Sequence, residues 1–473
     1  MSHEPGDTQG NIVRGYRHMH NVHYLFCEIR QVNRVRALLR KLSAARGDGS
    51  DEWHVRSDEH WKHKQAVHTA LNLALTYPGL ERLGWGDELE RFEDFKQGMY
   101  GRAAQLGDSD ADRWPPDLRD GAHLLFTIYF DEHPDNPRRV DDLRAELASS
   151  GLREVSCQTA RAIPRKAGES GMREHFGFRD GFSQPVLETG HRRAHPDRVK
   201  GEGVLEPPSS PLGRASWRAL RLGEVLLGHL DEDGVIAGGQ NPVLKNGTFM
   251  VWRKLEQHVK RFEEFFERAA SSKEEQEWLK AKVIGRWPDG TSLVESPYER
   301  PGRASKRPRN DFDYGGDPDG AGCPLGAHVR RANPRTSLGW WTVRSRRHRI
   351  IRRGMPYQED VEGEPEPRRG LIFVCFNASI SRQFELIQRH WLMDGDAFGL
   401  GGEQDLMLGS HGDPAKMTIQ GDRRRPAMLL NPAGERFVTV LGGYYLFVPG
   451  IAALGLIARG PSSRRRRLLA GTR

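Results

Sequence analysis

The sequence predicts an α+β protein in which strands alternate with helices along both halves of the chain. Short runs rich in aromatic and apolar residues, such as 23–29 (HYLFCEI) and 123–130 (HLLFTIYF), are typical of strands. Charged segments with an apolar stripe lie between such runs and predict helices. This order favours sheets covered by helices on one face. With 473 residues, of which 37% are hydrophobic and 29% charged, the chain is large enough for two or three water-soluble domains.

The elements of the first half follow one another in β-α-β order. In chain order we expect a strand at 23–29, a helix at 32–42, a strand and then a helix within 66–83 joined by a turn at Pro78-Gly79, a surface helix at 88–102, a strand at 123–130, a helix at 140–149 and a strand at 152–159.

A change of composition separates the two halves. Residues 187–214 are rich in Pro, Gly, Ser and His, which is typical of a linker or a long surface connection. We therefore expect domains at 1–205 and 206–473. In the second we expect strands at 224–229, 247–255, 370–376 and 437–448, and helices at 256–270, 274–283 and 384–391. No sequence repeat is visible, so a duplicated architecture is inferred from this pattern alone.

Charge and targeting signals narrow the class of protein. The net charge is +8, but the basic residues are scattered among 64 acidic ones, and the basic run at 464–467 is typical of a solvated terminus. We therefore expect no nucleic-acid partner. The four cysteines lie far apart, so no CxxC metal site exists. There is no visible secretory signal, and the longest apolar run, 444–458, is too short for a bilayer. These features favour a cytoplasmic protein without a membrane span.

The first candidate for chemistry is the glycine-framed segment 177–181, which contains Asp180. An aspartate in a glycine turn usually caps its own backbone. Here the aromatic side chains of Phe176, Phe178 and Phe182 surround it in the sequence. Apolar walls desolvate a carboxylate and tune it for acid/base work. The segment therefore indicates either a structural turn or a catalytic acid.

The second candidate is the basic stretch 323–357, which places His328 in a Gly-Ala frame ahead of a series of arginines. A neutral imidazole is a good ligand for haem iron, and arginines bind carboxylates or a developing oxyanion. Since His328 is one of 19 histidines, this stretch alone is weak evidence. Together, however, the two candidates supply an axial ligand, an acid/base carboxylate and a cation. Those groups are what heterolytic cleavage of a peroxide on haem requires.

The chain resembles the dye-decolorising peroxidase family, in particular its longer fungal and bacterial members. Segment 177–181 matches the GxxDG motif of that family, and several other segments match in the family's order. They are 9–16, 246–255, 285–287, 323–335, 352–357, 384–391 and 442–449.

The resemblance implies two ferredoxin-like domains, each an antiparallel sheet with helices, with haem b between them. It implies that His328 is the proximal ligand of the iron, that Asp180 is the distal acid/base group and that Arg352 is the distal arginine, in contact with both cofactor and peroxide. Arg335 would lie near a haem propionate. Hydrogen peroxide and dyes, phenolics or other organic reductants would be the substrates.

Some alternatives stay open in the sequence. A haem-binding or haem-handling protein with little turnover would need the same ligand. An acidic partner for the proximal imidazole is expected, and Asp405 and Glu403 are both candidates. Several aromatic residues could relay radicals to bulky substrates, although core packing is the more common role of such residues. They are Trp340, Trp341, Tyr357, Trp391 and Tyr445.

Overall fold

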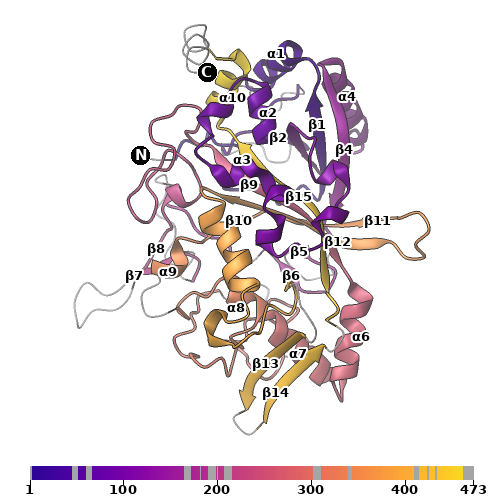
Figure 1. The fold of residues 1–473 in the computed structure, drawn as a ribbon, viewed down its shortest axis with the longest axis vertical. Coiled ribbons are helices and arrows are strands. Elements are labelled where there is room, and N and C mark those ends of the chain that lie inside the picture. Colours follow the sequence, from indigo (N-terminus) through magenta and orange to yellow (C-terminus); the bar gives the residue numbers. More distant parts are fainter. Residues whose placement is uncertain are drawn as a thin grey trace.

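The fold is that of a computed structural model (Figure 1). It describes residues 3–44, 52–59, 67–163, 172–181, 183–189, 199, 201–206, 216–301, 310–338, 343–409, 415–422, 425–431 and 434–461.

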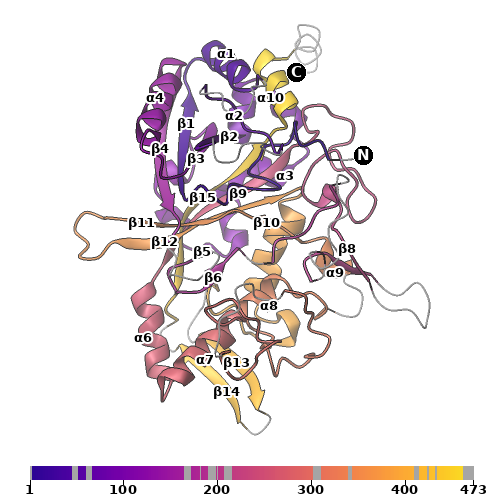
Figure 2. The same cartoon turned by 180° about the vertical axis from the view of Figure 1, so that it is seen from behind.

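One antiparallel sheet runs through the molecule, in the order β10-β12-β9-β15-β2-β3-β1-β4, with β11 also paired to β12. Its strands are β1 (Asn21–Ile29), β2 (Thr69–Leu75), β3 (Leu124–Phe130), β4 (Leu152–Arg161), β9 (Thr248–Gln257), β10 (Ile351–Arg352), β11 (Met355–Glu359), β12 (Arg368–Asn377) and β15 (Val438–Val448). The hairpin of β11 and β12 projects from the side of the body in both views (Figures 1 and 2).

The first half folds as a β-α-β-β-α-β unit. Helix α1 (Val32–Leu42) follows β1, and helix α4 (Asn136–Ser149) joins β3 to β4. The buried residues of α1 are Val35, Leu38, Leu39 and Leu42, a spacing that places them on one helix face. The strand order β4-β1-β3-β2 is that of a ferredoxin-like sheet.

The second half repeats this arrangement. Helices α6 (Val259–Ala269) and α7 (Lys273–Ile284) follow β9, and the π-helical turns η7 (Ser381–Glu385) and η8 (Ile387–Leu392) follow β12. The strand order is β15-β9-β12, with β10 and β11 outside β12. Strand β15 pairs with β2 where Phe447 meets Leu75, so the two sheets become one. The α+β class and the two ferredoxin-like sheets are confirmed.

The remaining elements are short. They are α2 (Tyr77–Arg82), α3 (Glu93–Gly101), α8 (His328–Ala332), α9 (Val343–Arg346), α10 (Ile451–Arg459), β5 (Met172–Arg173), β6 (Arg179–Asp180), β7 (Val204–Glu206), β8 (Ser216–Arg218), β13 (Ala415–Asp422), β14 (Arg425–Asn431), and the 3-10 turns η2 (Gly86–Glu88), η3 (Ala103–Leu106), η4 (Ala111–Arg113), η5 (Pro116–Leu118), η6 (Leu222–Glu224) and η9 (Ala397–Gly399).

Two local predictions were wrong for identifiable reasons. The Pro78-Gly79 pair is no turn but the first turn of α2, where the hydroxyl of Thr76 accepts a hydrogen bond from the Gly79 amide. Residues 224–229 form no strand; Glu224 ends η6, and the apolar residues after it are buried in turns. Among the elements that the sequence did not predict are β11, the hairpin of β13 and β14, and the helix α10.

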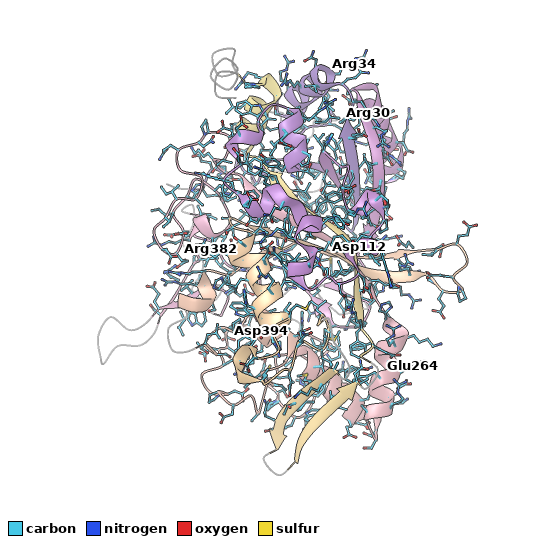
Figure 3. All side chains as sticks on the ribbon, in the orientation of Figure 1. Arg30, Arg34, Asp112, Glu264, Arg382 and Asp394 are labelled. Atoms are coloured by element: carbon cyan, nitrogen blue, oxygen red, sulfur yellow. The ribbon has the colours of Figure 1, made fainter. Side chains whose placement is uncertain are left out.

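Charged residues lie at both ends of the molecule. Arg30 and Arg34 lie by α1 at one end, and Glu264 lies on α6 at the other (Figure 3). In the described part of the chain, no helix has the length and apolar character needed to cross a membrane. The basic run at 464–467 lies outside the described residues, and the domain boundary at 205 and 206 is untested, so both stay predictions.

Candidate functional site

A cavity of about 290 Å³ lies against the sheet of the second half. Its apolar wall comes from β9, β12 and β15, which contribute Leu255, Leu371, Phe373 and Val440. Helix α8, the segment from β5 to β6 and strand β10 each add polar residues, among them His328, Asp180 and Arg352. A mostly apolar cavity with a few convergent polar groups is the usual form of a cofactor or ligand site.

His328 is the first residue of α8 and lines this cavity. Its Nδ1 lies 3.1 Å from Oδ2 of Asp405, whose side chain is fully buried. The other oxygen, Oδ1, accepts hydrogen bonds from the amides of Met407 and Leu408. With Nδ1 donating to Asp405, Nε2 of His328 makes no hydrogen bond within the described residues and carries the lone pair. The imidazole is therefore oriented and ready to bind a metal.

The charge of Asp405 is stabilised by its surroundings. Burial acts to raise the pKa of this carboxyl, but the His328 imidazole, through charge and hydrogen bonding, together with the Arg331 guanidinium holds it below its ordinary value. Glu403, the other candidate, is engaged elsewhere, because its oxygens accept from the amide and hydroxyl of Thr418 on β13. Of the two acidic residues left open by the sequence, Asp405 is the one that contacts His328.

Asp180 and Arg352 meet in the same cavity. Asp180 ends β6 and Arg352 ends β10. Nη1 of Arg352 donates to Oδ1 of Asp180 at 3.1 Å, and the Gly181 amide donates to the same oxygen at 2.6 Å. The two residues are 172 positions apart in the chain, yet they form one ion pair. The structure thus brings together the acid and the arginine that the sequence proposed separately.

Gln184 holds this pair in place and was missed by sequence reasoning. Its Oε1 accepts from the amide of Arg352 at 2.9 Å, and its Nε2 donates to the carbonyl of Arg352 at 3.2 Å. The side chain thereby pairs with both backbone groups of Arg352, much as a neighbouring strand would. The only signal in the sequence was its position, four residues after Asp180.

The aromatic environment expected around Asp180 is present in part. Phe176 and Phe178 are buried and line the cavity, and Phe176 stacks on Phe262 with ring centroids 4.3 Å apart. Phe182 lies outside the described residues. The Asp180 side chain is 24% exposed, so water still reaches it.

Arg335 does not line the cavity. Its guanidinium stacks over Phe312 and donates to the carbonyls of Gly201 and Asn310 and to the hydroxyl of Ser183. Ser183 is itself a wall residue, so Arg335 lies one residue behind the surface of the cavity. Its predicted contact with a haem propionate stays a prediction. Two arginines that do line the cavity, the buried Arg286 and the half-buried Arg349, were not predicted from the sequence.

The residues present fit haem. The cavity offers an imidazole whose Nε2 is not bonded, apolar walls for a flat ring, and arginines for its carboxylates. Burial lowers the pKa of Arg286, Arg335 and Arg349 to about 10 each, and Arg335 further lowers that of Arg286. Such a desolvated cationic group is stabilised by a bound anion, as a propionate would be.

The aromatic residues proposed as radical relays are mostly core residues. Tyr357, Trp391 and Tyr445 are all buried, and the hydroxyl of Tyr445 donates to Glu385 at 3.0 Å. Trp340 and Trp341 lie outside the described residues. The packing role preferred for such residues agrees with this burial, and a radical role stays untested.

Comparison with known proteins places the chain in a family. Residues 7–162 match the family model described as a DyP dimeric alpha+beta barrel domain, and residues 228–399 match the one described as Dyp-type peroxidase, C-terminal. A dye-decolorizing peroxidase of Mycetinis scorodonius is 28% identical over 82% of this chain and 76% of its own length. A multifunctional dye peroxidase of Amycolatopsis sp. is 29% identical over 85% of each chain.

Solved structures show the same fold. The fungal DyP-type peroxidase of Auricularia auricula-judae superposes with a TM-score of 0.78 at 24% identity, covering 97% of this chain and all of that one. A dye-decolorizing peroxidase in complex with 2,6-dimethoxyphenol gives a TM-score of 0.78 at 24% identity over 96% of this chain and 99% of its own. Two family models match the chain in order, two relatives match most of its length, and the solved structures share its fold. This chain therefore belongs to the DyP-type peroxidase family.

Proposed function

We propose that this family member is a haem b peroxidase that reduces hydrogen peroxide and oxidises dyes, phenolics or other organic reductants. The observation that carries the proposal is the Asp180–Arg352 pair, 3.1 Å apart, in the cavity that His328 also lines. The relatives named for dye oxidation, and the relative solved with a phenol, support the substrate class.

When bound, haem b supplies an iron that receives the peroxide and delivers its oxidising power to the reductant. In this proposal Nε2 of His328 is the iron ligand, and the Asp405 carboxylate orients the imidazole and raises its basicity. Arg286 and Arg349, which line the cavity, hold the carboxylates of the cofactor. Arg335 supports them from behind through Ser183.

Asp180 moves the proton. Oδ1 is occupied by the Arg352 guanidinium and the Gly181 amide, whereas Oδ2 accepts no hydrogen bond from the described residues. Oδ2 is therefore the atom that takes a proton from one peroxide oxygen and returns it to the leaving one. The Arg352 guanidinium stabilises the negative charge that develops on the leaving oxygen.

The test is the substitution Asp180→Asn, with Asp112→Asn as a matched control at an exposed position. Asp180→Asn should slow the reaction of the haem protein with peroxide by about 10²- to 10⁴-fold while haem stays bound. Stopped-flow absorption at the Soret band measures both properties. An unchanged rate in Asp180→Asn would remove the proposed role. His328→Ala should lose or loosen the haem, and an unaltered histidine-ligated spectrum would refute the ligand assignment.

A haem-binding or haem-handling protein with little turnover is the second candidate. One stretch of 85 residues is 33% identical to a deferrochelatase of Yersinia pestis, covering 18% of this chain. The absorption spectrum before and after one equivalent of hydrogen peroxide, followed by steady-state dye oxidation, separates the two candidates. The expected cytoplasmic location and the expected lack of a nucleic-acid partner stay predictions.

A further inference from the structure

A second cavity is separated from the first by the segment that runs from β5 to β6 and ends at Asp180. It has a volume of about 530 Å³ and opens where the edge strand β4 lies beside β11. No ladder of hydrogen bonds joins these two strands in the described sheet, although each pairs with a strand on its other side. The wall of this cavity includes His23, Phe130, His175, Tyr357 and Gln358.

His175 connects this cavity to the first one. It is a central residue of the turn in which the Gly177 amide donates to the Glu174 carbonyl. Its two chain neighbours, Glu174 and Phe176, line the first cavity, whereas His175 lines the second. Consecutive Cα atoms are about 3.8 Å apart. A ligand in the second cavity would therefore be separated from the first by the thickness of a single turn of chain.

The hydrogen bonding of His175 fixes its tautomer. Its Nε2 lies 2.9 Å from the carbonyl oxygen of Tyr357, an acceptor only, so Nε2 carries the hydrogen. Nδ1 then carries a lone pair, and it makes no hydrogen bond within the described residues. Burial is the main cause that lowers the pKa of His175, and the Arg369 guanidinium acts in the same direction. The neutral form of the imidazole, with Nδ1 as an acceptor, is thereby favoured over the charged form.

A second neutral imidazole faces an aromatic wall. The rings of His23 and Phe130 meet edge to face with centroids 5.1 Å apart. Nδ1 of His23 is buried and bonds to no described partner, and burial lowers the pKa of His23 as well. Among the described residues, no carboxylate lines this cavity and Arg161 is the one cation that does; it is 67% exposed and paired with Glu132. An aromatic wall with neutral acceptors suits a small phenol better than a carboxylate or a cation.

We propose that the second cavity binds a small phenolic reductant and that Nδ1 of His175 accepts the phenolic proton when the phenol is oxidised. This inference rests on the proposed function, because the cofactor oxidised by peroxide is the electron acceptor. The O–H bond of the phenol breaks, its proton goes to Nδ1 of His175, and one electron passes to the cofactor in the first cavity. The phenoxyl radical then leaves through the open side of the second cavity.

Two substitutions test the site on the haem-loaded full chain. Gln358→Trp places an indole at the mouth of the cavity from an exposed position on β11, a strand that accepts Trp readily. His175→Gln retains a terminal amide that can donate to the Tyr357 carbonyl but removes the Nδ1 acceptor. His133→Gln, at a histidine outside both cavities, is the control.

Binding is measured by calorimetric titration with 2,6-dimethoxyphenol. Gln358→Trp should weaken binding by at least about tenfold, and His175→Gln by about fivefold, the value of one lost hydrogen bond. His133→Gln should bind as the unchanged protein does. Equal affinities in all four proteins would overturn the proposal, whether or not the chain has peroxidase activity. The outcome therefore separates a failure of this site from a failure of the proposed function.

The proton transfer has its own readout. Ferrocyanide gives up an electron without a proton, so it provides a reference reductant. In His175→Gln, kcat/KM for 2,6-dimethoxyphenol should fall at least about 10²-fold further than kcat/KM for ferrocyanide. Equal losses for the two reductants would mean that His175 only supports the fold of the turn, and would refute its role as proton acceptor.

Discussion

Gln184 offers a sharp test of whether the distal pair must be held in place. The substitution Gln184→Ala removes two hydrogen bonds, of 2.9 and 3.2 Å, to the backbone of Arg352. Each such bond contributes about 1 kcal/mol, so the free energy of unfolding should fall by about 2 kcal/mol. The peroxide reaction should slow by up to about 10²-fold, because a displacement of about 1 Å at a reacting group costs that much.

Urea unfolding gives the first quantity, and stopped-flow reaction of the haem protein with peroxide gives the second. Gln97→Ala is the matched control. Gln97 also makes two side-chain hydrogen bonds, to Glu93 and from Arg102, but it lies on α3 outside the cavity. A Gln184→Ala protein that loses stability yet keeps its full peroxide rate would refute the positioning role. Gln184→Glu keeps the acceptor for the Arg352 amide, so its stability and its peroxide rate should lie between those of the unchanged protein and Gln184→Ala.

Two further predictions follow from buried carboxyl groups. Asp405→Asn replaces a charge-assisted hydrogen bond to His328 by a neutral one. The reduction potential of bound haem should therefore rise by about 60 mV, the one-electron equivalent of about 1.4 kcal/mol. An unchanged potential in a spectroelectrochemical titration would contradict this prediction. Burial raises the pKa of Asp58 from 3.8 to about 7. Because the unfolded chain releases this proton at a lower pH than the folded one does, stability decreases as pH rises from about 4 to about 7. In Asp58→Asn the free energy of unfolding should therefore fall by on the order of 2–4 kcal/mol less over this pH range. The Tm of the variant should exceed that of the unchanged protein at about pH 8 but not at about pH 4. Parallel Tm curves for the two proteins would show that Asp58 does not titrate in this range.

The fold was accessible from the sequence wherever the apolar pattern had a clear period. Helix α1 has the predicted bounds, and β1 and β12 differ from prediction by only a few residues, because each presents a regular buried face. The failures occurred where local chemistry competes with pattern. A proline followed by glycine reads as a turn, but at Pro78 it opens a helix capped by Thr76.

The site was predictable only through residues that carry a motif. His328, Asp180 and Arg352 could be named, and Asp405 could be narrowed to one of two candidates. Gln184 could not, because its role is set by a backbone 168 residues away. Arg349 could not be distinguished from its basic neighbours in the sequence, since only burial marks it as a wall residue.

The position of β15 in the sheet has a consequence for how the protein is made. This strand, at Val438–Val448, is the last strand of the described chain, yet it lies in the interior of the sheet between β9 and β2. It also supplies Val438 and Val440 to the wall of the cofactor cavity. During synthesis the ribosome must therefore release β15 before that wall is complete. In the proposed function, haem would accordingly bind only after β15 has been made, and the emerging chain must stay unaggregated until then.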